Sequence, residues 1–129
     1  MDDNQTTGLD HVLGFEYRRA DGEQVVIEWD VRPEHHQPFG IVHGGVYCAA
    51  VESAASIGAA MWLDDRGKVV GVSNHTDFLR SASAGRMTAT ATPIHRGRSQ
   101  QLWQVEIADD QQRLVARGQV RLQNLTDPG

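Results

Sequence analysis

Alternation of apolar and polar residues, with a period of two, is the main pattern along this chain. In the stretch EQVVIEWDV, residues 23–31, the side chains of Val25, Ile27, Trp29 and Val31 fall on one face. The residues between them are mostly polar, which is typical of a half-buried β-strand. Similar runs, separated by turn-forming residues, predict a chain made largely of strands. The predicted strands are residues 15–19, 23–31, 69–79, 87–95, 101–108 and 114–122.

Details within these runs predict where the strands bend and how they pair. Gly71 interrupts the third predicted strand, and Pro93 indicates an edge position or a bulge in the fourth. In the last strand one face is expected to carry Leu114, Ala116, Val120 and Leu122, and the other Arg117, Gln119 and Arg121. Because short turns connect the last four strands, we expect them to form a consecutive antiparallel meander.

Residues 44–63 have a different pattern, in which small and apolar side chains continue without alternation. The length predicts one long helix, and a second, short helix is expected near residues 8–13. Small residues all round a helix indicate close neighbours on most of its sides. A curved antiparallel sheet wrapped around a central helix meets that requirement. The sequence therefore predicts an α+β fold, and the free edges of a single sheet suggest pairing with a second copy.

Length and composition favour one domain, residues 1–129, of a cytoplasmic protein. The formal net charge of −5 argues against a nucleic-acid-binding surface. The single cysteine, Cys48, allows no internal disulfide and suits a reducing compartment. The acidic N-terminus lacks the apolar segment of a signal peptide, so we expect none.

The helix predicted over residues 44–63 is also long enough to span a bilayer. Its single charge, Glu52, would cost about 2.5 kcal/mol or more near the membrane centre. Ala, Gly and Ser, which make up most of the run, insert weakly. We therefore expect a helix buried inside a soluble protein and no membrane association.

The first turn of this helix, near His43, Gly44 and Gly45, offers backbone N–H groups that lack intrahelical partners. Such a terminus can bind an anion or a developing oxyanion, although the glycines also suit a simple tight turn. Glu52 lies eight residues after Gly44, about 12 Å along the axis at 1.5 Å per residue. One helix cannot aim both groups at one carbonyl, whereas two antiparallel helices across a two-fold axis can. The spacing predicts a site shared between two chains; polar partners at a dimer interface are the alternative explanation of Glu52.

Two polar residues near Glu52 and Gly44 are weaker candidates. Ser56 follows Glu52 at i+4 on the same helix face, so its hydroxyl can orient the carboxylate or a water, or simply pack. Gln37 precedes the helix, and its amide can donate a hydrogen bond to a carbonyl. Phe39 is expected to be an ordinary hydrophobic anchor.

A metal site is not expected from the six histidines. His35, His36 and His43 lie near one another, but their spacing matches no standard zinc pattern. Cys48 lies inside the helix without the partners of a nucleophile. The chain also lacks the glycine spacing of a nucleotide-binding loop, so we expect no metal and no cofactor.

Arginines at turns or strand ends in the second half suggest a site for an anionic group. These are Arg80, Arg96 and Arg98, the last two within the sequence HRGR. A guanidinium matches the geometry of a phosphate, so this loop can bind one. Ordinary solvated charge at hairpin turns explains the same residues equally simply.

The stretch QPFGIVHGGVYCAAVESAAS, residues 37–56, closely resembles the helix motif of hotdog-fold acyl-CoA thioesterases. It is most similar to the PaaI-like branch that includes bacterial 1,4-dihydroxy-2-naphthoyl-CoA thioesterases and the proofreading thioesterase of enterobactin synthesis. The resemblance continues through KVVGVSNHTDFLRSASAGR, ATPIHRGRSQQLWQVEI and RLVARGQVRL, and covers roughly residues 9–124. It implies the hotdog fold, in which a long helix is wrapped by a curved antiparallel sheet.

The same resemblance implies roles for individual residues. Glu52 matches the catalytic carboxylate, as nucleophile or general base, and Gly44 the donor of the oxyanion N–H. Gln37 matches the residue that contacts the thioester carbonyl, His43 the motif histidine near the thioester, and Ser56 the residue that places water. For coenzyme A the matching residues are Arg80, Ser81, Arg96 and Arg98. Because an apolar medium disfavours the charged carboxylate, we expect water or hydrogen-bond donors around Glu52.

The implied function is hydrolysis of an aromatic acyl-CoA, of the 1,4-dihydroxy-2-naphthoyl or benzoyl type, to free acid and coenzyme A. Phe39 and Met61 are candidates for the acyl pocket, and menaquinone synthesis is one suggested pathway. A homodimer is expected from the shared site, and a homotetramer from the resemblance. Two alternatives stay open: a hotdog enoyl-CoA hydratase or dehydratase that uses His43, and a non-catalytic acyl-CoA-binding protein.

Overall fold

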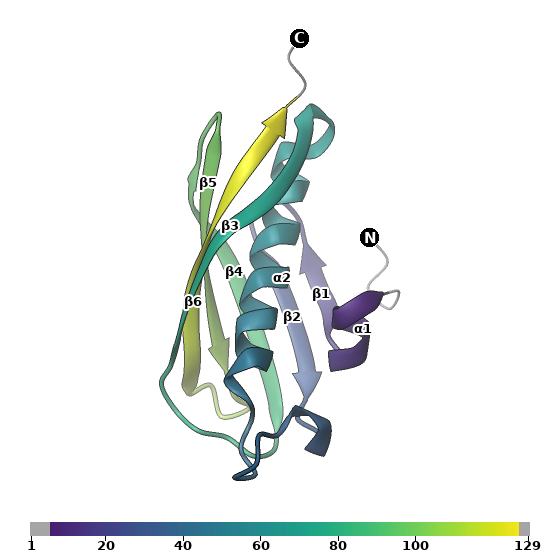
Figure 1. The fold of residues 1–129 in the computed structure, drawn as a ribbon, viewed down its shortest axis with the longest axis vertical. Coiled ribbons are helices and arrows are strands. Elements are labelled where there is room, and N and C mark those ends of the chain that lie inside the picture. The colour runs from purple at the N-terminus through teal and green to yellow at the C-terminus, as the bar shows by residue number, and fades with distance from the viewer. Residues whose placement is uncertain (1–5, 127–129) are drawn as a thin grey trace.

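The structure is a computed structural model that describes residues 6–126. A curved six-stranded antiparallel sheet wraps one long helix (Figure 1). The strands are β1 (Glu16–Ala20), β2 (Val25–Asp30), β3 (Gly67–Phe78), β4 (Arg86–Arg96), β5 (Gln100–Ala108) and β6 (Leu114–Thr126). The helices are α1 (Gly8–Leu13) and α2 (Gly44–Leu63), with short 3-10 turns η1 (Pro33–His35) and η2 (Asp64–Arg66). The predicted α+β fold and both predicted helices are confirmed.

The order of strands across the sheet is β1-β2-β4-β5-β6-β3. The expected four-strand meander is therefore wrong, because β3 pairs with β6 and only β4, β5 and β6 are consecutive neighbours. The reason lies in strand length: β3 has 12 residues and β6 has 13, and they pair from Gly67 through Phe78. Pairing β3 with β6, the two longest strands, satisfies more backbone N–H and C=O groups than pairing β3 with the shorter β4 would.

Both breaks that the sequence predicted appear as irregularities of pairing. The register between β3 and β6 shifts between Gly71 and Ser73, and that between β4 and β5 shifts between Pro93 and His95. Pro93 also lies beyond Ala91, where the pairing of β4 with β2 ends, so it has a strand neighbour on one side only.

A further irregularity in β6 corrects the prediction for its first residue. The register between β5 and β6 shifts between Ile107 and Ala108, opposite the start of β6. Val115 is therefore fully buried, whereas Leu114 is 39% exposed instead of sharing the inner face. Past the shift the predicted alternation holds, with Val120 and Leu122 in the core.

The small residues of α2 allow the helix to lie deep in the concave face of the sheet. A Cβ added at Gly58 would lie 2.6 Å from the ring of Trp103 on β5. Beside it, Gln101 donates to the carbonyl of Ala59 at 3.2 Å and accepts from the indole of Trp103 at 2.8 Å. Ala60 and Met61, in contrast, are exposed, so among residues 6–126 nothing covers this side of the helix at its C-terminal end.

By length and apolar composition, the described part of the chain contains one helix that could cross a bilayer, Gly44–Arg66. The central helix of a soluble protein has the same composition. Half of the most apolar stretch of this helix is buried inside the protein, against the sheet that wraps it (Figure 1). This packing is that of a core helix.

Strand β3 forms one edge of the sheet, and no strand within residues 6–126 pairs with its outer side. Its apolar side chains Val70, Val72 and Phe78 are 44%, 53% and 56% exposed. Natural proteins usually pair, cover or charge a long apolar edge of this kind. The edge therefore agrees with the expectation that this chain pairs with a second copy.

Candidate functional site

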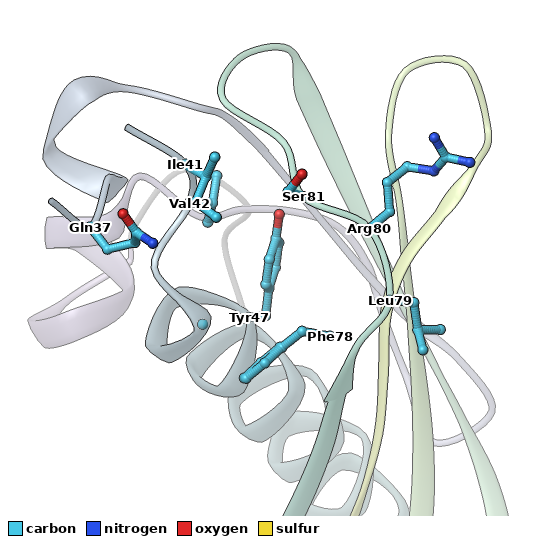
Figure 2. Close-up of a pocket in the computed structure, with 9 residues that line it drawn as sticks. Gln37, Ile41, Val42, Tyr47, Phe78, Leu79, Arg80 and Ser81 are labelled. Atoms are coloured by element: carbon cyan, nitrogen blue, oxygen red, sulfur yellow. The ribbon is translucent and has the colours of Figure 1, made fainter. Parts of the chain in front are cut away.

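A pocket of about 380 Å³ lies at the N-terminal end of α2, between the chain that enters the helix and the end of β3 (Figure 2). Its lining residues are Gln37, Ile41, Val42, Gly44, Tyr47, Phe78, Leu79, Arg80 and Ser81. The volume falls in the range of small-molecule sites, and the lining combines apolar side chains with a few polar groups. Four of the residues predicted from the sequence meet here: Gln37, Gly44, Arg80 and Ser81.

The N-terminus of α2 presents its backbone to this pocket. His43 caps the helix, because its ring Nδ1 accepts a hydrogen bond from the N–H of Gly45 at 2.8 Å. The N–H of Gly44 has no hydrogen-bond partner among the described residues. A Cβ at Gly44 would lie 2.6 Å from the ring of Phe78, so a larger residue would displace that ring, which lines the pocket. His43 thus has a structural role as a cap, with Nε2 left to carry the ring proton.

Gln37 is held so that its amide nitrogen is available. A tight turn runs from Gln37 to Gly40, whose φ of 81° favours glycine, and the N–H of Gly40 donates to the carbonyl of Gln37 at 3.0 Å. The side-chain oxygen of Gln37 accepts from the N–H of Phe39. With that oxygen engaged, the amide nitrogen points toward the pocket (Figure 2). It can therefore donate to a carbonyl oxygen there.

Tyr47 is a pocket residue that sequence reasoning missed. It lies one turn after Gly44, and its side chain stands between the two walls of the pocket (Figure 2). Only 3% of the residue is exposed, and its hydroxyl has no partner among the described residues. Burial, with a smaller effect from the charge of Asp109, raises the pKa of Tyr47, so the hydroxyl stays protonated at neutral pH. A large aromatic residue among the small ones of the first turns of α2 was the available signal.

Glu52 does not line this pocket and lies farther along α2, as its spacing from Gly44 predicts. The carboxylate is half-buried and accepts hydrogen bonds on both oxygens. Ser56 donates its hydroxyl to Oε2 at 3.3 Å, and Asn74 of β3 donates its amide to Oε1 at 3.1 Å. The expectation of hydrogen-bond donors around Glu52 is confirmed, as is the contact with Ser56.

Gly71 and Asn74 on β3 were not singled out from the sequence as site residues. Gly71 faces the carboxylate of Glu52 so closely that an added Cβ would clash with Oε2. The bulge between Gly71 and Ser73 therefore lies where the strand passes the acid. Asn is uncommon in strands, so Asn74 in a predicted strand was a weak signal that could have been followed.

Because the resemblance implies that Glu52 is the reacting carboxylate, replacing Gly71 with Ala is expected to lower kcat about 10- to 100-fold with little loss of stability, since displacing a reacting group costs about this much. Only the tip of the Glu52 side chain must move to admit the new Cβ. The check is to measure kcat beside the thermal midpoint of unfolding. An unchanged kcat would show that the position of this carboxylate does not matter.

The four residues predicted to bind coenzyme A lie in two separate places in the chain. Arg80 and Ser81 line the pocket at the N-terminal end of α2. Arg96 lies near the other end of the helix, where it donates to the carbonyl of Gly22 at 2.7 Å and to Glu23 at 2.8 Å. Its guanidinium also lies 5.6 Å from the ring centroid of Trp62. Arg98 is exposed in the adjoining turn.

The two candidates for the acyl pocket, Phe39 and Met61, do not line the pocket that holds Gln37 and Gly44. Phe39 is 90% exposed, so the expectation that it is a hydrophobic anchor within this chain is wrong. The tight turn at Gln37 explains this, because it directs residue 39 away from the core. Met61 is 42% exposed on the uncovered side of α2.

In the range 6–126 no three His, Cys, Asp or Glu side chains are grouped so that they could hold a metal ion. His35 is buried, with its two ring nitrogens engaged by the N–H of Arg32 at 2.8 Å and the carbonyl of Leu13 at 2.8 Å. This histidine therefore fastens the loop before α2 to the end of α1.

Comparison with known proteins agrees with the fold and with the motif. Residues 39–116 match the thioesterase superfamily. A 1,4-dihydroxy-2-naphthoyl-CoA hydrolase of Listeria monocytogenes is 39% identical over 108 residues, which cover 84% of this chain and 88% of the relative. The crystal structure of AziG from S. sahachiroi has 53% identity and a TM-score of 0.93, covering 95% of this chain and 100% of that one.

The crystal structure of a thioesterase from Haemophilus influenzae has 28% identity and a TM-score of 0.84, and it covers 98% of this chain and 96% of that one. The family match spans more than half of the chain and includes α2 with Gly44 and Glu52. The chain therefore belongs to the thioesterase superfamily, and it is a thioester hydrolase with the hotdog fold.

Proposed function

We propose that this protein hydrolyses an aromatic acyl-CoA, of the 1,4-dihydroxy-2-naphthoyl or benzoyl type, to the free acid and coenzyme A. One observation carries the proposal: the pocket gathers two donors for a thioester carbonyl, the amide of Gln37 and the N–H of Gly44. Its remaining walls, formed by residues such as Tyr47 and Phe78, are largely aromatic and aliphatic. The similarity to a naphthoyl-CoA hydrolase supports the aromatic acyl group, and with it a place in menaquinone synthesis.

The acid for this reaction comes from a second copy of the chain. Within one chain Glu52 lies about 12 Å along α2 from Gly44 at 1.5 Å per residue, too far to reach the same carbonyl. A two-fold axis that places two α2 helices antiparallel brings the Glu52 of one chain to the Gly44 of the other. The uncovered side of α2 and the unpaired edge of β3 both support this pairing. A homotetramer would form from two such dimers, in the cytoplasm.

In the proposed reaction the Gly44 N–H and the Gln37 amide stabilise the oxyanion that forms as the thioester carbonyl is attacked. Glu52 acts in one of two ways. As a general base it takes a proton from water, whose oxygen bonds to the carbonyl carbon. As a nucleophile its oxygen bonds to that carbon, and water later cleaves the resulting anhydride. Either way the carbon–sulfur bond breaks, coenzyme A leaves as the thiolate, and Ser56 helps to place the water.

The same antiparallel pairing accounts for the positions of Arg80 and Arg96 at opposite ends of α2. Trp62, beside Arg96, lies 18 residues after Gly44, about 27 Å along the helix. One chain therefore cannot direct Arg80 and Arg96 at one phosphate group. Two antiparallel chains place the far end of one α2 beyond the Gly44 end of the other. In the dimer Arg80 and Ser81 of one copy, with Arg96 and Arg98 of the second, would bind the nucleotide of coenzyme A.

Thiol release from a panel of acyl-CoA substrates tests this function. We expect hydrolysis of naphthoyl- and benzoyl-type substrates with kcat/KM at least about tenfold higher than for straight-chain substrates, because an aromatic pocket discriminates by shape. A preference for straight chains would contradict the aromatic assignment. Tight binding of acyl-CoA without thiol release would indicate a non-catalytic protein, and hydration of an enoyl-CoA without thiol release would indicate a hydratase.

A further inference from the structure

Asn74 occupies a position on β3 from which its side chain reaches α2. The side-chain nitrogen donates to Oε1 of Glu52 at 3.1 Å and to the backbone carbonyl of Cys48 at 3.1 Å. Cys48 is four residues before Glu52, so both acceptors lie on the same side of the helix, one turn apart. The amide thus ties the carboxylate to a fixed point of the helix backbone.

Thr76 determines which way this amide faces. Its hydroxyl donates to the side-chain oxygen of Asn74 at 2.8 Å. Because that oxygen is engaged, the nitrogen must face the helix and act as the donor there. A reversed amide would place its oxygen against the carboxylate of Glu52 and the carbonyl of Cys48, both of which are acceptors. Thr76 therefore acts on Glu52 through Asn74.

The remaining contacts of the Glu52 carboxylate also restrict its movement. Ser56 donates to Oε2 at 3.3 Å, and the backbone at Gly71 lies directly against the same oxygen. Each oxygen thus has one donor, and the strand blocks rotation toward the sheet. In the described part of the chain, no Lys, Arg or His nitrogen forms an ion pair with Glu52. Neutral groups alone orient this acid and leave its charge uncompensated.

We infer that Asn74, oriented by Thr76, is a positioning residue that holds the Glu52 carboxylate in the direction needed for attack on a thioester bound by the second copy. The inference rests on the proposed function, because it gives a role to the same acid. A fixed carboxylate matters in such a site, since a displacement of about 1 Å of a reacting group can cost 10²-fold in rate. Asn74 itself need not touch the substrate.

The effect on kcat of Asn74→Ala tests this inference. We expect kcat to fall about 10- to 100-fold with KM changed less than about twofold, since only the reacting group is disturbed. Thr76→Val is also expected to lower kcat. Thr76→Ser, which keeps the hydroxyl, is expected to have a kcat close to that of the unmodified protein. Gln104→Ala is the matched control, because this amide on β5 bonds Thr92 on the outer face of the sheet and not α2.

A double-mutant cycle separates positioning from a general structural effect. In a Glu52→Asp background the shorter carboxylate no longer reaches Asn74, so adding Asn74→Ala should cause no further loss of kcat. Equal losses in both backgrounds, or an unchanged kcat in the single variant, would overturn the inference. If Glu52 variants retain full activity, the proposed function fails. If they lose activity while Asn74→Ala does not, only the inference fails.

Discussion

Replacing Glu52 with Gln is expected to lower kcat for thioester hydrolysis by about 10²- to 10⁴-fold, the usual contribution of a positioned acid or base. Gln has the same shape, and its side-chain oxygen can still accept from Asn74 as Oε1 does now. It can neither take a proton from water nor form the anhydride, so both proposed roles are lost. KM should change little, because Gln37 and Gly44, the proposed donors to the carbonyl, lie elsewhere. Free thiol release under saturating substrate measures kcat.

The matched control for this change is Glu106→Gln. Glu106 is an exposed acid on the outer face of β5, away from α2, and the substitution removes the same charge. We expect its kcat and thermal midpoint to equal those of the unmodified protein. Activity of the Glu52→Gln variant within about threefold of this control would be too small a loss for a catalytic acid or base and would remove Glu52 from the mechanism.

Much of the fold could be predicted because its signals are local. The bounds of α2 follow from a run of small and apolar residues with a single charge, and the buried face of β2 follows from the alternation of Val25, Ile27 and Trp29. Glycine and proline also marked the irregularities at Gly71 and Pro93. Each of these features depends on residues within a few positions along the chain.

The errors concern features that depend on distant pairing. The place of β3 beside β6 depends on which long strands can satisfy each other's backbone N–H and C=O groups. No pattern within residues 67–78 indicates which strand that is. The exposure of Leu114 follows from a register shift between two strands, which alternation in one strand does not reveal. Likewise, Phe39 is exposed because a turn formed around it directs the side chain outward.

For the site, the sequence indicated single residues but not the contacts between them. Gln37, Gly44 and Glu52 were found from the motif and from the spacing along one helix. The environment of Glu52 was found only in part: Ser56 is a helix neighbour at i+4, whereas Gly71 and Asn74 reach the carboxylate from β3. Such contacts require knowledge of which strand passes the helix. Tyr47 was overlooked because a buried aromatic residue in a helix is usually core.

Co-expression of two inactive variants is expected to restore activity if the site is shared between chains. One chain carries Glu52→Gln and keeps Gln37; the other carries Gln37→Ala and keeps Glu52. Each homodimer should be at least about 100-fold impaired, since loss of one donor to an oxyanion costs about that much. In the heterodimer one site combines the intact Gln37 of the first chain with the intact Glu52 of the second. The other site carries both defects.

Two different affinity tags, used in succession, isolate the heterodimer, and thiol release from the preferred aromatic acyl-CoA measures its activity. The shared site predicts about half of the wild-type kcat per dimer, since one of two symmetry-related sites is intact. A site contained within one chain would leave every site with a defect. A purified heterodimer no more active than its two parents would therefore contradict the account.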